Sequence, residues 1–403
     1  MAVAAVSVTE ALPLSPSSPA RAHRQCRLTR HEGAAGAEVS GNCRIAALGP
    51  AVSVAKTVRP DYPGGNCTRI RRLTLTIGDI AVDPSVLLAP LAGITDLPFR
   101  RRVAAFGAGL VVSEMVASGE LITERPSVRA KARSDLGLAD GTPTSVQLAG
   151  REARAMAEAA RIVADMGARV IDINMGCPAK KVTGGLSGSA LMRDLDHALG
   201  LVDAVVGAVE VPVTLKCRLG WDADCVNAPD LARRAEAAGV RMITVHGRTR
   251  QQFYAGTADW AAIRAVAAAV SLPVVANGDI RDLASARSAL AASGAAAVMI
   301  GRGARGAPWR LAEVAAGLSG APAPAVPKGA ALGDYISSHY EDMLSFYGRD
   351  LGVRIARKHL GWYADEAAVA PALRARMLVA GSAEEVLALV ARAFGGAPER
   401  RAA

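Results

Sequence analysis

The segment Ile171 to Ser189 brings together the residues best suited to chemistry, and it reads IDINMGCPAKKVTGGLSGS. Apolar residues up to Ile173 predict a buried strand, which breaks at Asn174 into a turn that holds Cys177 between a glycine and a proline. A thiol at the end of a strand, beside two lysines and several glycines, favours a reactive group that faces an anionic ligand. The alternative is a structural cysteine in a tight turn, which is the usual role of a lone cysteine.

Eight short apolar segments, mostly followed by stretches with helical spacing, must position this turn. They are Val86–Ala89, Gly109–Ser113, Thr144–Leu148, Arg169–Asn174, Val213–Cys217, Met242–His246, Val274–Ala276 and Ala297–Ile300. Such units within residues 73–317 predict an α/β fold, a (β/α)8 TIM barrel. An open doubly wound sheet is the competing interpretation, but no GxGxxG follows the first strand.

In a barrel of this kind, the residues that follow the strands share one rim. The residues expected there are polar and chemically varied: Pro90, Gln147, Asn174, Cys177, Lys216, Arg218, His246, Asn277, Asp279, Gly301 and Arg302. The glycines after the last two strands, with Arg302, are suited to hold a phosphate, although they could equally form tight turns only.

Two rim residues leave their chemistry open. Lys216 suits either a Schiff base or the stabilisation of negative charge on a flavin ring. His246 could orient a ligand, or could simply be hydrogen-bonded within the rim, which is the commoner role of a lone histidine. Gln147 has donors and acceptors for the amide edge of a ring.

Composition limits the class of protein. The chain has 403 residues and a formal net charge of +10, which favours a polyanionic partner. The six cysteines have no metal-ligand spacing, so we expect a reducing compartment, the cytoplasm, with neither structural zinc nor another metal. No apolar run reaches the ~20 residues that span a bilayer.

Residues 1–72 differ from the rest of the chain. They carry ten basic and four acidic residues and have no sustained periodicity. We expect a disordered basic extension. An organellar transit peptide, or a start codon placed too far upstream, would give a similar pattern.

A second, helical unit is predicted at the C-terminal end. Residues 318–330 are rich in Pro, Gly and Ala and read as a linker, and residues 331–403 as a small all-helical domain. Its helices are expected over Leu332–Leu344, Arg354–Trp362 and Ala383–Phe394, the last capped by Ser382. Three cations fall on one helical face: Arg354, Arg357 and Lys358. Such a run is ordinarily a solvated face, but it could contact phosphates if the substrate is a nucleic acid.

Several segments match one family and occur in one order along the chain. They are LAPLAGITDLPFR (from Leu88), SEM (from Ser113), QLAG (from Gln147), DINMGCPAKKV (from Asp172), LKCRLGW (from Leu215), VHGRTRQQFYAG (from Val245), ANGDI (from Ala276), MIGRGARGAPW (from Met299) and RIARKHLGWY (from Arg354). On these segments the sequence resembles the flavin-dependent tRNA-dihydrouridine synthases, most closely their bacterial B-type branch. Only the first 72 residues fall outside the resemblance.

The resemblance implies an FMN enzyme, recharged by NADPH, that reduces the 5,6 double bond of tRNA uridines. Cys177 would donate the proton, because a cysteine thiol is mostly protonated at neutral pH. The implied FMN ligands are Pro90, Leu91, Ala92, Gln147, Lys216, His246, Asn277, Gly278, Asp279, Gly301 and Arg302. The implied tRNA contacts are Asn174, Arg218, Arg250, Arg354, Arg357 and Lys358. The target base must leave the folded tRNA to reach the mouth of a barrel. We also expect the protein to be a monomer.

Three other functions remain as alternatives. A different FMN barrel acting on a free pyrimidine would lack a use for the helical unit. An aldolase with Lys216 as Schiff-base lysine would be colourless. An RNA-binding protein without catalytic activity would not need Cys177.

Overall fold

A computed structural model of the protein describes residues 75–123, 138 and 141–395. These residues belong to one compact unit, 67–403. The expectation for the basic extension, residues 1–72, lies outside the described residues.

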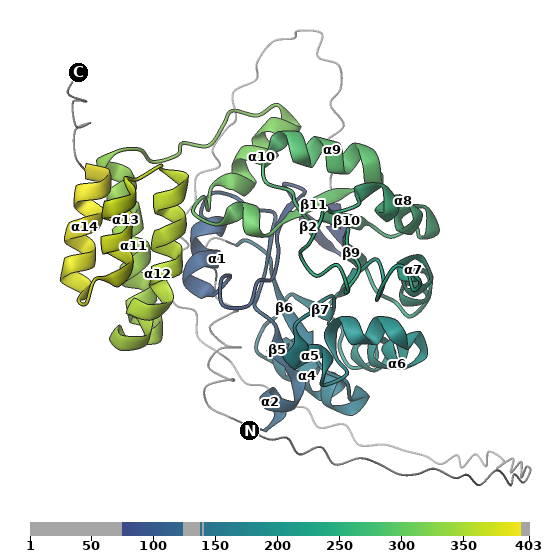
Figure 1. Cartoon of the computed structure of the whole chain (residues 1–403). Helices are drawn as coiled ribbons and strands as arrows, with labels where there is room; N and C mark the ends of the chain where they lie inside the picture. Colours follow the sequence, from purple (N-terminus) through teal and green to yellow (C-terminus); the bar gives the residue numbers. More distant parts are fainter. Residues whose placement is uncertain (1–74, 124–137, 139–140, 396–403) are drawn as a thin grey trace, which may run out of the picture. The chain divides into compact units, whose positions relative to one another are not determined.

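Eight parallel strands close into a barrel (Figure 1). They are β3 (Val86–Leu88), β4 (Leu110–Val112), β6 (Thr144–Ala149), β7 (Val170–Met175), β8 (Val213–Arg218), β9 (Met242–His246), β10 (Val274–Asn277) and β11 (Ala297–Ile300). Pairing of β4 with β6 completes the circle. The TIM barrel is thereby confirmed, and the eight predicted strands agree with these bounds to within about one residue because each contains several buried apolar residues.

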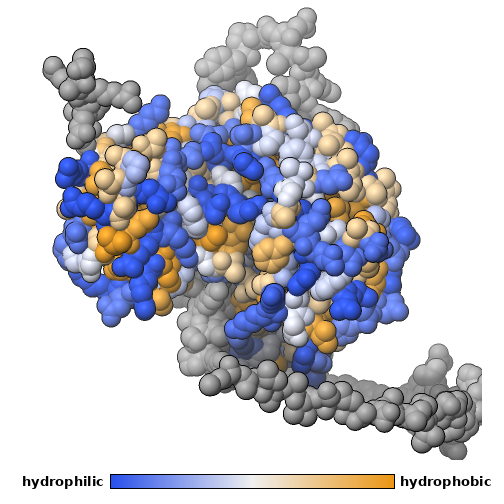
Figure 2. Space-filling view, viewed as in Figure 1, coloured by the Kyte–Doolittle hydropathy of each residue, from blue (hydrophilic) through white to orange (hydrophobic). Residues whose placement is uncertain are grey.

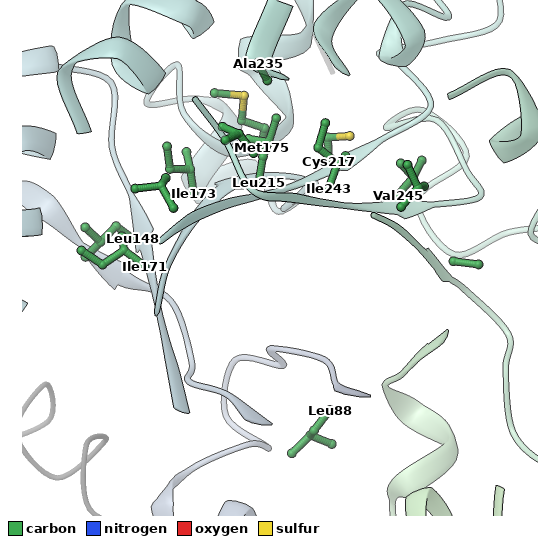
Figure 3. Close-up of a cluster of buried hydrophobic side chains, with 14 of the residues drawn as sticks. Leu88, Leu148, Ile171, Ile173, Met175, Leu215, Cys217, Ala235, Ile243 and Val245 are labelled. Atoms are coloured by element: carbon green, nitrogen blue, oxygen red, sulfur yellow. The ribbon is translucent and has the colours of Figure 1, made fainter. Parts of the chain in front are cut away.

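Helices follow the strands and surround them. They are α1 (Leu97–Ala104), α2 (Ser118–Ile122), α4 (Ala153–Asp165), α5 (Lys180–Thr183), α6 (Leu195–Val206), α7 (Ala228–Ala237), α8 (Trp260–Ala269), α9 (Leu283–Ser293) and α10 (Arg310–Ser319), with short 3-10 turns η1 (Gly188–Arg193) and η2 (Arg302–Ala304). Outward strand residues pack against these helices. In Figure 3, Leu215 and Ile243 lie near Ala235 of α7 within one buried cluster.

Strand residues that point into the barrel change character along the strands, because side chains alternate between the two faces. Near the amino ends they are apolar, as at Val170 and Met242. Two to four residues later, on the same face, they become polar, as at Asn174 and His246. The barrel interior is therefore apolar at the amino ends of the strands and polar at their carboxyl ends, which form the mouth of the barrel.

A hairpin closes the apolar end of the barrel, and the sequence analysis did not predict it. Strands β1 (Leu75–Ile77) and β2 (Ile80–Val82) pair antiparallel. Their alternate residues Leu75, Ile77, Ile80 and Val82 are buried with the apolar inward residues of the barrel. A two-residue strand, β5 (Val116–Ala117), pairs with β6 and was also missed.

Four helices form the C-terminal region (Figure 1): α11 (Ala330–Tyr347), α12 (Arg349–Glu366), α13 (Pro371–Val379) and α14 (Ala383–Gly395). Three of them were predicted, and Ser382 caps the last by accepting the backbone N–H of Glu385 at 3.1 Å. The sequence analysis missed α13. The α11 and α12 helices pack on the barrel's α1. Hydrogen bonds from Arg102 to Ser338 (2.9 Å) and from Tyr347 to Asp96 (2.8 Å) join the two parts.

The surface of this protein is mainly hydrophilic on the face shown in Figure 2. None of the helices in the described part of the chain combines the length and apolar character that crossing a membrane requires.

Candidate active site

A cavity of about 740 Å³ opens at the carboxyl ends of the strands. It is lined by nearly all the barrel residues predicted for the site: Pro90, Leu91, Ala92, Gln147, Asn174, Cys177, Lys216, Arg218, His246, Asn277, Gly278, Asp279, Gly301 and Arg302. Arg250 does not line it, and neither do Arg354, Arg357 and Lys358. The parallel register therefore gathers side chains from across 213 positions of sequence around one space.

A chain of hydrogen bonds supports the turn that carries Cys177. Buried Asp172 accepts from Thr214 at 2.7 Å and from Gln147 at 2.6 Å. Gln147 in turn accepts from the Asn174 side chain at 2.7 Å. Asn174 then accepts the backbone N–H of Cys177 at 3.0 Å. Each polar group is paired with the next, so the buried network holds the turn in one conformation.

Asp172 anchors that network from inside the barrel. Burial raises the pKa of its carboxyl, while the hydrogen bonds from Gln147 and Thr214 act in the opposite direction. The sequence analysis placed this residue in a strand and in the DINMGCPAKKV segment but gave it no role. A carboxylate within an otherwise apolar strand was the signal that could have identified it, since buried carboxylates are rare unless they are paired.

Lys216 projects from β8 into the cavity, and its ammonium donates to the side-chain oxygen of Asn277 at 3.0 Å. Burial, with the nearby charge of Arg218, lowers the pKa of Lys216 to about 8. Asn277 holds the lysine without neutralising it, because a carboxamide is uncharged. The amide nitrogen of Asn277 donates to the Met299 carbonyl at 2.8 Å. A half-buried cation whose hydrogen-bond partner is neutral is suited to an anionic ligand.

His246 and Arg218 are cross-strand neighbours at the mouth. Burial lowers the pKa of His246 well below its usual range, so the imidazole is neutral at physiological pH. Its Nδ1 is buried and has no hydrogen-bond partner among the described residues. His246 lines the cavity, and a neutral imidazole can donate or accept a hydrogen bond to a ligand there.

Arg218 acts as a clamp within the mouth. Its guanidinium donates to the carbonyls of Gly176 (2.8 Å), Thr249 (2.8 Å) and Phe253 (3.0 Å). It thereby ties the Cys177 turn to the loop after β9. Tyr254 in that loop is 46% exposed, and its ring lies 4.8 Å from the guanidinium carbon of Arg302. The sequence analysis named Tyr254 only as part of the segment VHGRTRQQFYAG and gave it no role.

The loop after β10 lets its backbone lie close to neighbouring atoms. Gly278 has φ +111°, and a Cβ there would meet Ala258 at 2.8 Å. Asp279 accepts from the buried Arg248 at 2.5 Å and from the backbone of Ala258 at 2.9 Å. Burial raises the pKa of Asp279, but these hydrogen bonds outweigh it and lower the pKa overall. Sequence analysis missed Arg248, whose pairing depends on the folded loop.

The cavity carries a marked excess of positive charge. Its cationic side chains are Lys216, Arg218, Arg281, Arg302 and Arg305. Among the described residues that line it, only Asp279 carries a carboxylate, and that carboxylate is shared by Arg248 and Arg302. This balance favours an anionic ligand. The described residues include no group of three or more His, Cys, Asp or Glu side chains arranged to hold a metal ion.

The three cations predicted on one face of the C-terminal region differ in exposure and in their hydrogen-bond partners. Arg354 is exposed and donates a hydrogen bond to the Asp350 carbonyl of its own helix, at 3.3 Å. Arg357 is half-buried, and its Nε lacks a hydrogen-bond partner among the described residues. Lys358 donates to the backbone carbonyl of Gly93 in the barrel. Arg250 lies outside the cavity, stacked on Trp221 at 4.6 Å.

Comparison with known proteins agrees with this geometry. The family model described as dihydrouridine synthase (Dus) matches residues 87–395, which covers the barrel and the C-terminal helices. The chain belongs to the dihydrouridine synthase family. The match includes Cys177 and each residue that lines the cavity.

Curated members of the dihydrouridine synthase family share much of this sequence. A probable tRNA-dihydrouridine synthase of Rhodobacter capsulatus is 69% identical over 331 residues, which is 82% of this chain and 100% of the relative. One from Rhizobium leguminosarum is 56% identical, covering 73% of this chain and 89% of the relative. The tRNA-dihydrouridine synthase B of Xanthomonas campestris is 47% identical, covering 78% and 94%. The resemblance to this family, including its B-type members, is confirmed.

Proposed function

We propose that this protein reduces the 5,6 double bond of uridine in tRNA to 5,6-dihydrouridine, with FMN as cofactor and NADPH as the reductant that recharges it. The observation that carries the proposal is that one cavity is lined both by Cys177 and by a cationic, glycine-rich set that includes Gly278, Gly301 and Arg302. The relatives' names support the same reaction.

The chemistry of the lining fits FMN. The backbone around Gly278 and Gly301, with Arg302, is suited to hold its phosphate. Lys216 would face the ring, where its charge stabilises the anionic reduced form. Pro90, Leu91 and Ala92 would contact the ring from the loop after β3. Gln147, His246, Asn277 and Asp279 complete the proposed set.

Cys177 supplies the proton in the proposed reaction. FMN, when bound, supplies the hydride that is added to C6 of the uracil. The Cys177 thiol transfers its proton to C5, so the double bond gains two hydrogens and the thiolate regains its proton from solvent. Asn174 holds the turn of Cys177 through two backbone N–H groups, at 3.0 and 3.1 Å. Arg218 limits the movement of the same turn through Gly176.

The tRNA surface is proposed to extend from the mouth to the C-terminal helices. Asn174, Arg218 and Arg250 would meet the flipped uridine and its neighbours. Arg354 and Arg357 would contact phosphates from α12. We propose residues 73–317 as the catalytic domain, 318–330 as a linker, and 331–403 as the tRNA-binding domain. A cytoplasmic monomer is proposed as the working form.

The decisive experiment is the analysis of tRNA from cells that lack this protein. Loss of dihydrouridine at one or a few positions, restored by the intact gene but not by a Cys177→Ala version, is the expected result. Unchanged dihydrouridine in these cells would contradict the proposal. Reduction of free uridine by the purified protein, in preference to tRNA, would favour a small-molecule reductase instead.

A further inference from the structure

Lys358 connects the C-terminal helices to a loop that lines the cavity. It lies on α12, and its ammonium donates to the carbonyl of Gly93 in the loop between β3 and α1. This loop lines the cavity with Pro90, Leu91 and Ala92. Gly93 has φ +73°, and a Cβ there would lie 3.5 Å from the Lys358 ammonium. The lysine therefore sits directly on the segment proposed to contact the flavin ring.

The same loop is held from several sides. Glu114, at the end of β4, accepts the backbone N–H of Gly93. The hydroxyl of Thr95 accepts the backbone N–H of Leu91 at 2.8 Å. Asp96, which caps α1, accepts from Tyr347 of α11 at 2.8 Å. The barrel fixes one side of the loop, and the C-terminal helices fix the other.

A second cavity loop also rests on α12. Gly306 follows η2, and a Cβ there would lie 2.3 Å from the carbonyl oxygen of Trp362, so only glycine permits this contact. The guanidinium carbon of Arg305, a cavity residue, lies 5.0 Å from the centre of the Trp362 ring. Lys358 and Trp362 are one helical turn apart, so one face of α12 touches both loops.

We propose that Lys358 is a positioning residue for the β3–α1 loop, and that α12 supports from behind the two loops that line the cofactor site. Its charge is then used within the protein and not on a tRNA phosphate, whereas Arg354, one turn earlier and exposed, remains free for the nucleic acid. A hydrogen bond from an ammonium to a carbonyl is stronger than one between neutral groups. The proposal rests on the proposed function, because it concerns the loop that would hold FMN.

The test compares Lys358→Met with Arg354→Met. Both variants remove one charge from α12 and keep an unbranched side chain. In the absence of FMN, we expect amide hydrogen exchange in residues 89–96 to accelerate about tenfold in Lys358→Met and to stay unchanged in Arg354→Met. The FMN dissociation constant should rise about tenfold only in Lys358→Met. Lys358→Arg, which keeps a cationic donor, should restore most of both.

Binding of tRNA over a salt series should show the reverse pattern, with an effect in Arg354→Met and none in Lys358→Met. Arg354→Met should lower the salt slope by up to about one unit, and Lys358→Met should leave it at the wild-type value. A lowered slope in Lys358→Met, with loop exchange and FMN affinity unchanged, would overturn the inference and return Lys358 to the tRNA surface. Wild-type protein that binds no FMN would refute the proposed function, while hydrogen exchange still tests the loop contact.

Discussion

The side-chain oxygen of Asn174 accepts a hydrogen bond from the backbone N–H of Cys177 over 3.0 Å. The same oxygen accepts from Gly176 at 3.1 Å, and the amide nitrogen donates to Gln147. One strand residue thus fixes the turn that holds the thiol and links it to the barrel interior.

Replacing Asn174 with Ala should separate thiol placement from cofactor binding. The two backbone N–H groups lose their acceptor, so the turn should become mobile and oxidation of the reduced enzyme by tRNA should slow by about 10- to 100-fold. FMN content should change little. Rapid-mixing absorbance at the flavin band measures the rate. Asn227→Ala is the control, because Asn227 bonds to Met192 at 2.7 Å outside the cavity. Equal rates in the two variants would count against the assignment.

Cys177→Ala tests the proton donor itself. FMN content and reduction by NADPH should survive, because the thiol is not needed for either. Oxidation of the reduced flavin by tRNA should slow by roughly 10²-fold or more, whereas oxidation by oxygen should not. Cys225→Ala is the matched control, since this half-buried thiol lies outside the cavity. Normal tRNA modification by Cys177→Ala would show that another acid is used.

Lys216 predicts two pH effects of opposite sign. Burial lowers its pKa to about 8, so above pH 8 the lysine loses its charge and FMN should bind more weakly. Folding of the apoprotein behaves oppositely. Between pH 8 and about 10.4 the unfolded chain keeps the proton that the folded protein has released, so stability rises with pH in this window.

The comparison with Lys216→Met isolates both effects. In the variant, the FMN dissociation constant should be larger at pH 7 and should lose this pH dependence. The gain in unfolding free energy above pH 8, at most about 3 kcal/mol, should also disappear from denaturant titrations. A variant that retains the wild-type pH profile of FMN affinity would indicate that Lys216 does not face the ligand.

Two truncations should give contrasting results. Deleting residues 1–70 should leave the melting temperature and FMN content nearly unchanged, because the described barrel closes without them. Deleting residues 1–83 also removes the β1–β2 hairpin and its four buried apolar residues. Each is worth roughly 1.5–3 kcal/mol, so the longer truncation should lower the melting temperature by many degrees or prevent folding. Thermal unfolding of the two proteins provides the measurement, and similar values would contradict the role given to the hairpin.

Periodicity predicted the barrel because each strand contains several buried apolar residues, and the polar residues at and after the strand ends must share a rim. The hairpin was missed although Leu75-Thr76-Ile77 alternates and Gly78-Asp79 marks its turn. It adjoins the basic extension, and three alternating residues are too few to indicate a strand. Lys358 was predicted to lie on a face that is either solvated or in contact with phosphates, and the structure also gives it a hydrogen bond to Gly93, 265 positions away. Local spacing cannot report such contacts, because they depend on how two packed units meet.

The excess of arginine around the cavity has a practical consequence for handling the protein. Phosphate and sulfate from purification buffers should collect at the end lined by Gly278 and Arg302, where they would compete with the cofactor for the same donors. Reconstitution in a buffer whose anions are bulky and weakly binding should therefore reach full occupancy at lower FMN concentration. Crystals grown from sulfate should, for the same reason, contain protein without FMN more often than protein with FMN bound.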